Sequence, residues 1–253
     1  MVFVFWLLVD CVPVFSDAYA MDAGQITCYP TYGYRQGDAW VIPMRVWVHE
    51  RRGAAEKVIT KVAASMGSLD AGELANFRAR IQDFVADSQS REKVAFTFDQ
   101  DPERRVFRVE DGDGANPKTD LNGLIQGVII IPHAKAVELL DRQGSPRGWL
   151  TFRAVSEGHA GTGRVRLIEE EGLSVISDID DTVKVTQIPA GAKVVIRNTF
   201  FRDFLPVPEM ARMYQAWLGA AFHYISGSPW QLYRPLSEFL VGPAGGFPEG
   251  SFH

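Results

Sequence analysis

The sequence predicts an α/β protein in two parts, a β-rich part followed by a parallel α/β sheet. Short runs of Val, Ile, Phe, Tyr and Trp, separated by Gly, Pro, Asp and Asn, continue from about residue 26 to residue 168. Strands then alternate with amphipathic helices. The unbroken apolar run Leu173–Ser177 indicates a strand buried on both faces of a parallel sheet. We therefore expect a β-rich, sandwich-like accessory domain over 25–168 and an α/β domain over 169–253.

Alternation of side chains predicts the strands of the first part. Val94, Phe96 and Phe98 indicate a strand, followed by a turn at Asp99–Arg104 and a return strand at Val106–Val109. A further strand is expected within Leu124–Ile131. Another strand has five residues on one face, Trp40, Ile42, Met44, Val46 and Val48.

One helix is expected inside the β-rich part. Its apolar stripe consists of Leu74, Phe77, Ile81, Phe84 and Val85. Charged residues lie opposite this stripe, which is the pattern of a surface helix that packs on one side. Asp70 and Glu73 have the spacing of a capping box, so the helix should begin just after Asp70.

The second part should continue with a helix around Glu209–Leu218, a strand at Ala221–Ser226 and a helix over Trp230–Leu240. Its first strand ends in a series of acids. Asp178 and Asp180 are separated by one residue, so both should point into one crevice while Ile179 turns to the core. The carboxyl ends of parallel strands are where ligands bind in open α/β sheets.

Two carboxylates at this spacing repel each other unless a cation joins them, and Mg²⁺ prefers such oxygen ligands. Asp178 could then attack phosphorus, and Asp180 could hold the proton for the leaving oxygen. Thr182 could fix the loop through its hydroxyl. A solvated acidic turn is the alternative. An EF-hand does not fit, because Val183 and Pro189 stand where its loop needs Gly and Glu.

Several motifs resemble one known family. Ser177–Thr186 (SDIDDTVKVT) is similar to the signature of the actin-patch-protein type of phosphatidate phosphatase catalytic domain, in the lipin-like branch of the haloacid dehalogenase superfamily. The resemblance continues through three further segments in the same order, Asn198–Phe200, Tyr224–Tyr233 and Gly246–His253. It is weaker in the β-rich part, at Tyr29–Gly33 and Trp40–Glu50.

This resemblance implies a haloacid-dehalogenase-like parallel α/β domain with a Mg²⁺ cofactor. Asp178 would be the nucleophile and a metal ligand, and Asp180 the general acid/base and the second ligand. Ser226 would hold the transferring phosphoryl group, with Thr182 and Gly227 completing the substrate-binding set. Relatives often carry Asn or Ser at the position of Gly227. The implied substrate is phosphatidate at a membrane surface, whereas residue chemistry alone indicates only a phosphomonoester.

The family's charge-neutralising lysine and a later acidic loop lie downstream of the position that matches His253. The chain is therefore expected to be truncated relative to the family and inactive or very weak. Lys184 is interpreted as a loop or surface charge. The apolar segment from Phe200 to Leu205 is interpreted as a candidate for contact with acyl chains. The alternative function is a non-catalytic lipid- or protein-binding module with a degenerate phosphatase domain.

Composition limits the partners. Of 253 residues, 46% are hydrophobic and 23% charged, which is typical of a globular protein. The net charge of −5 provides no overall positive field for nucleic acid. Cys11 and Cys28 lack the spacing of a zinc site or a disulfide framework. None of the five histidines has metal-ligand spacing.

The N-terminus leaves the localisation open. The apolar run Val2–Val9 is much shorter than the roughly 20 residues that cross a bilayer, but it suits the core of a signal peptide. Ala18–Ala20 offers a cleavage site, whereas no basic residue precedes the run and Asp10 ends it early. The chain is therefore predicted to be exported if residues 1–20 are a signal peptide, and cytoplasmic otherwise.

Overall fold

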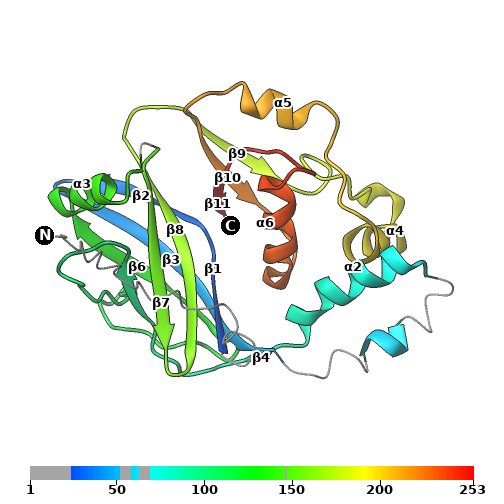
Figure 1. Ribbon diagram of the computed structural model, residues 1–253, viewed down its shortest axis with the longest axis horizontal. Helices are drawn as coiled ribbons and strands as arrows, with labels where there is room; N and C mark the ends of the chain where they lie inside the picture. The colour runs from blue at the N-terminus through cyan, green and yellow to red at the C-terminus, as the bar shows by residue number, and fades with distance from the viewer. Residues whose placement is uncertain (1–23, 52–57, 63–68, 146) are drawn as a thin grey trace, which may run out of the picture.

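The computed structural model describes residues 24–51, 58–62, 69–145 and 147–253 (Figure 1). The predicted signal peptide at 1–20 and Cys11 lie outside these residues. Within the described ranges, no helix has both the length and the apolarity that crossing a bilayer requires.

The β-rich part forms one curled sheet. Strands β1 and β2 pair antiparallel with β3 and in parallel with β8, so they fill the space between those two long strands. Strand β6 pairs with β3, β7 with β8, and β5 with β7. The eight strands are β1 Gly24–Cys28, β2 Thr31–Gln36, β3 Ala39–Glu50, β4 Asp87–Ser88, β5 Ala95–Phe98, β6 Leu124–Pro132, β7 Trp149–Ser156 and β8 His159–Ile168.

Two isolated bridges, Phe96–Phe107 and Glu110–Val128, connect β5 to β6 and close the curl. The predicted return strand at Val106–Val109 is reduced to these contacts. The alternating residues of β3 and β5 lie in the core, as predicted. The β-rich character of the first part is thereby confirmed. Helix α3 (His133–Arg142), which directly follows β6, was not predicted.

Helix α2 (Ala71–Ile81) begins where the capping box places it. The Asp70 carboxylate accepts a hydrogen bond from the Glu73 amide at 2.8 Å. The 3₁₀ turn η2 (Gln82–Phe84) follows directly. Figure 1 shows α2 away from the large sheet and close to α4 of the second part.

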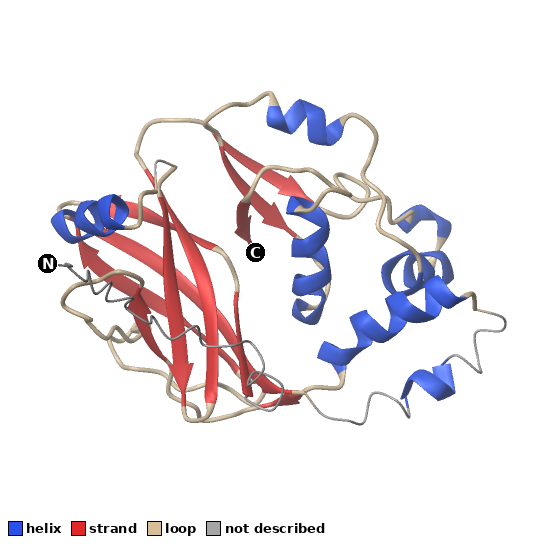
Figure 2. Cartoon of the chain, viewed as in Figure 1, coloured by secondary structure: helices blue, strands red, loops and turns tan. Residues whose placement is uncertain are grey.

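The second part contains a three-stranded parallel sheet in the order β11-β10-β9. Figure 2 shows most helices on this side of the molecule. The predicted strand and helix positions are confirmed, with shorter bounds for the helix around Glu209. The elements are β9 Ser174–Asp178, η3 Ile188–Ala190, α4 Ala192–Ile196, the π-helix η4 Arg197–Phe201, α5 Met210–Gln215, β10 Ala221–Ile225, η5 Trp230–Leu232, α6 Tyr233–Val241 and β11 Gly250–Phe252.

The prediction that β9 is buried on both faces is wrong. Ile176 has 72% of its surface exposed. The opposite face is covered, because Val175, Phe222 and Tyr224 belong to a core cluster that includes residues of α6. No helix in the described ranges covers the face that carries Ile176. An apolar run in the sequence does not indicate whether both faces of its strand are covered.

The two parts are in direct contact. The Phe252 amide donates to the Pro30 carbonyl at 2.9 Å, and the Tyr29 hydroxyl donates to the Trp230 carbonyl at 3.3 Å. The rings of Tyr29 and Tyr233 lie 5.0 Å apart. The break between β1 and β2 therefore lies against β11 and the start of α6.

Candidate active site

The predicted catalytic residues lie at the carboxyl ends of β9 and β10. Asp178 is the last residue of β9 and is paired in register with Ile225 of β10. The loops that follow these two strands therefore leave the sheet at one edge. The structure thus brings together the Asp178–Thr182 loop and the Ser226–Ser228 loop, as the sequence predicts.

Asp178 is exposed, and its Oδ2 accepts a hydrogen bond from the Thr182 hydroxyl at 3.2 Å. Ile179 is fully buried, so the alternation predicted for this strand end holds. An exposed carboxylate with one hydroxyl partner can bind a ligand without losing a strong interaction. Thr182 therefore lies next to the predicted nucleophile, where it fixes the loop.

Asp180 lies in a different environment. Its Oδ1 accepts hydrogen bonds from the Thr186 hydroxyl at 2.6 Å and the Lys184 ammonium at 2.9 Å. Its Oδ2 faces Ser228 and Ser226, at 3.1 and 3.4 Å. The carboxylate thus connects its own loop with the loop after β10.

These contacts determine the charge of Asp180. Burial raises the pKa of the Asp180 carboxyl, but hydrogen bonds from Thr186 and Lys184 and the charge of Lys184 together lower it further. The pKa therefore lies below its usual value, and the group is ionised at neutral pH. In this state Asp180 can accept a proton, and it can donate one only after it has taken one up.

Lys184 corrects a sequence-based interpretation. It was expected to be a surface charge, but only 1% of its surface is exposed and its ammonium is ion-paired with Asp180. The physical reason is the turn at Asp181–Val183, which brings the Lys184 ammonium back to the Asp180 carboxylate and to the Thr186 hydroxyl. A lysine inside an apolar run was the signal that could have identified it, because a charge is buried only with a partner.

Asp181 is a second residue that sequence reasoning missed. It has a φ of +61°, a conformation that Asp tolerates better than most residues. Its carboxylate accepts the amide hydrogens of Thr186, Gln187 and Ile188 at 2.7, 2.6 and 2.7 Å. Burial raises the pKa of the Asp181 carboxyl, but these amides lower it more, so the pKa lies below its usual value. Asp181 therefore holds the loop closed.

The loop after β10 contains Ser226 and Gly227, both predicted to bind substrate. The Ser226 hydroxyl accepts the Ser228 amide at 3.1 Å, in addition to its contact with Asp180. A side chain at Gly227 would meet no atom within 4 Å, so the structure places no steric demand for glycine there. Ser228 lies closer to Asp180 than Ser226 does and was not predicted.

The oxygen donors of Asp178 and Asp180 suit a hard divalent cation such as Mg²⁺. Among the described residues, no group of three or more His, Cys, Asp or Glu side chains is placed to hold a metal ion. These two carboxylates with nearby hydroxyls would therefore supply only part of a metal shell. Lys184 occupies Oδ1 of Asp180, which leaves Oδ2 on the side of the serine loop.

The predicted acyl-contact segment belongs mostly to the core. Phe201 and Phe204 are buried, and Phe200 packs against two core clusters. Leu205 alone of the four apolar residues is exposed. His223 donates to, or accepts from, the Ser251 hydroxyl at 2.7 Å and so has a partner inside the sheet.

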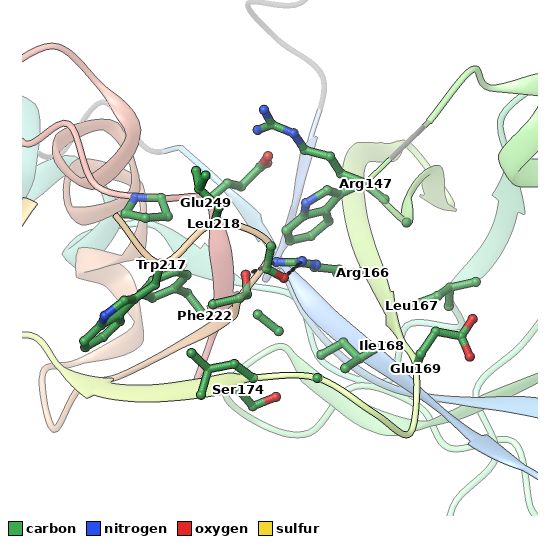
Figure 3. A pocket seen from close by; sticks show the side chains of 18 of the residues that line it. Arg147, Arg166, Leu167, Ile168, Glu169, Ser174, Trp217, Leu218, Phe222 and Glu249 are labelled. Carbon is green, nitrogen blue, oxygen red and sulfur yellow. Dashed lines mark hydrogen bonds between the residues drawn. The ribbon is translucent and has the colours of Figure 1, made fainter. Parts of the chain in front are cut away.

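A cavity of about 950 Å³ lies at the opposite end of the sheet (Figure 3). Its wall includes Arg166, Trp217 and Ser174, where β9 begins. Arg166 donates to the carbonyls of Ala220 and Gly219 at 2.7 and 3.0 Å. This cavity is therefore separate from the site at the strand ends.

Comparison with known proteins gives a match for the segment that contains this site. Residues 173–253 match the model of the family described as phosphatidate phosphatase APP1, catalytic domain. The predicted resemblance to this type of catalytic domain is therefore confirmed for that segment.

Two curated proteins are similar to the chain. One is the uncharacterized protein C29B5.04c of Schizosaccharomyces pombe, 38% identical over 82 residues, which are 30% of this chain and 13% of that protein. Phosphatidate phosphatase APP1 of Saccharomyces cerevisiae is 29% identical over 110 residues, which are 40% of this chain and 18% of that protein. The similarity thus covers less than a fifth of either relative.

Proposed function

We propose that residues 169–253 carry the nucleophile and the acid–base group of a magnesium-dependent phosphatase with a haloacid-dehalogenase-like arrangement. The observation that carries this proposal is the contrast between two neighbouring carboxylates. Asp178 is exposed with one hydroxyl partner, whereas Asp180 is half-buried and held by four side chains. Such a contrast separates a nucleophile from an acid–base group.

In this mechanism the Asp178 carboxylate attacks phosphorus and forms an aspartyl-phosphate, while the leaving oxygen takes up a proton. Asp180, which is ionised at neutral pH, would first take up a proton from solvent, then give it to the leaving oxygen, and later take one from the attacking water. The hydroxyls of Thr182 and Ser226 orient the phosphoryl oxygens. Mg²⁺, when bound through Asp178 and Asp180, would offset the repulsion between the carboxylates and the phosphate.

The proposed substrate is phosphatidate, and the printed names of the matched family and of the yeast relative support it. A lipid substrate implies work at a membrane surface. A non-catalytic lipid- or protein-binding role is the competing proposal, and the same assay separates the two.

The test is phosphate release by the 253-residue chain, measured with Mg²⁺ and with a chelator. Phosphatidate in mixed micelles and soluble p-nitrophenyl phosphate serve as parallel substrates. We expect slow release that requires Mg²⁺ and that Asp178→Asn abolishes, with the melting temperature changed by less than about 2 °C, since the side chain is exposed. The control, Asp113→Asn, alters a carboxylate in the turn at 110–120 and should leave the rate unchanged.

Magnesium-independent release, or release that survives Asp178→Asn, would contradict the assigned nucleophile. No release from either substrate would favour the binding module. Equal rates on both substrates would support the phosphatase chemistry while removing the preference for a lipid.

A further inference from the structure

Helix α2 belongs by sequence to the β-rich part, between β3 and β4, but it packs on η4 of the second part. Glu73 accepts two hydrogen bonds from Arg197, at 3.0 and 2.7 Å. The ring of Phe77 stacks on that of Phe201 with a centroid distance of 4.8 Å. Asp83, just after the helix, accepts a hydrogen bond from Arg234 of α6 at 3.2 Å. The helix is therefore docked on η4 and α6, which lie next to the Asp178–Lys184 loop, called the catalytic loop below (Figure 1).

Arg80 is the most buried charge of this helix, with 7% of its surface exposed. Its guanidinium donates to the carbonyls of Thr199 and Arg202 at 3.0 and 2.7 Å. It also lies 3.8 Å from the centre of the Phe204 ring. Burial lowers the pKa of Arg80 to about 10, so the side chain stays charged at neutral pH. Arg80 thus fixes both the end of η4 and the ring that follows it.

The same ring contacts the catalytic loop. The Lys184 ammonium lies 5.0 Å from the centre of Phe204 and is paired with Asp180. The Val185 amide donates to the Leu205 carbonyl at 2.9 Å, so the backbone next to Phe204 is joined to the backbone next to Lys184. A continuous set of contacts therefore leads from Arg80 through Phe204 and Lys184 to Asp180.

We propose that α2 is a positioning element of the phosphatase site, in which Arg80 fixes Phe204 and thereby keeps Lys184 on the Asp180 carboxylate. This inference rests on the proposed function. It assigns a role to the β-rich part, which contributes helix α2 to the scaffold of the neighbouring site. Arg80 touches no reacting group, so its effect is on orientation alone. Displacing a catalytic group by about 1 Å can reduce the rate about 100-fold.

The test compares Arg80→Met with Arg78→Met, an exposed arginine on the same helix. We expect Arg80→Met to lower kcat by about 100-fold, with KM changed by less than about twofold because ground-state binding is kept. Arg80→Lys retains the charge and one donor, so it should recover part of kcat. It also serves as the test variant if Arg80→Met does not fold. Arg78→Met should match the unchanged protein. Loss of thermal stability with an unchanged kcat would overturn the proposal.

A double variant tests whether Arg80 and Lys184 affect kcat through the same set of contacts or independently. If Arg80 acts through Lys184, the pair Arg80→Met and Lys184→Met should cost no more in kcat than Lys184→Met alone. Multiplicative losses would show that Arg80 acts by another route and would overturn the proposal.

Hydrogen exchange provides a readout that does not need activity. The amides of Thr186, Gln187 and Ile188 donate to Asp181. They should exchange faster in Arg80→Met than in the unchanged protein, and at the same rate in Arg78→Met. If no variant releases phosphate, the proposed function fails while exchange still decides the role of α2. Unchanged exchange in Arg80→Met would refute that role, whatever the rates.

Discussion

At the scale of single residues, three acids within four positions, from Asp178 to Asp181, have three different environments. Asp178 is open to solvent, Asp180 is paired with a buried lysine, and Asp181 accepts three backbone amides. Backbone direction causes this division, because Ile179 takes the core position and the positive φ of Asp181 turns the chain back. One carboxylate is thus open to a ligand, while the other two are bonded to groups of their own loop.

Asp181 allows a stability prediction with a defined pH dependence. Replacing it by Asn removes the charge and one acceptor from the three amides, so Asp181→Asn should lower the free energy of unfolding by about 1 kcal/mol at pH 7. The folded-state pKa of Asp181 lies below its unfolded value of about 4, so its contribution is present above that pH and is lost as the pH falls through the folded pKa.

Urea denaturation of both proteins at pH 7 and near pH 3 checks this prediction. The difference between them should shrink at the lower pH. A difference that grows on acidification would contradict the sign of the pKa shift. Asp113→Asn is the control, and it should follow the unchanged protein at both pH values.

At the scale of elements, β8 must approach β1 closely. A Cβ on Gly161 would lie 1.9 Å from the Ile26 carbonyl oxygen, where β1 and β8 pair in parallel. Gly161→Ala should therefore force these strands apart and lower the free energy of unfolding by about 3 kcal/mol. Gly112→Ala is the matched control, because no atom lies within 4 Å of its Cβ position. Equal stability of the two variants, measured by chemical denaturation, would contradict the close pairing.

The elements also show what the sequence could predict. Side-chain alternation located β3 and β5, the capping box located the start of α2, and the acidic motif located the sheet edge at which β9 ends with Asp178. These are local patterns, and the local backbone follows them.

Long-range packing was not accessible from the same patterns. The docking of α2 on η4 and the uncovered face at Ile176 depend on which elements become neighbours. Helix α3 was missed although Pro132, the last residue of β6 and the N-cap of α3, is a boundary signal in the sequence. Its interior Lys135 is buried in an ion pair with Asp101, a partner that only tertiary contact provides.

At the scale of the whole molecule, the small parallel sheet depends on its neighbours. Its three strands have helices on one face, and the β-rich part contacts the second part at several places. At the break between β1 and β2, Tyr29 packs on Tyr233. Arg166 of β8 donates to the backbone just before β10. Helix α2 contributes Arg80 and Phe77, which contact η4. The packing of α2 and β11 thus crosses the boundary that the sequence predicts near residue 169.

This arrangement predicts that the protein unfolds as one cooperative unit. Scanning calorimetry should show a single transition with equal calorimetric and van't Hoff enthalpies. Tyr29 is buried between the two parts, and Tyr29→Ala should lower the stability of that single transition by about 3 kcal/mol. Tyr34→Ala, at a half-exposed position of β2, is the control and should have a smaller effect. Two separate transitions in the unchanged protein would show that the parallel sheet stands on its own, and would leave α2 as a contact between independent domains.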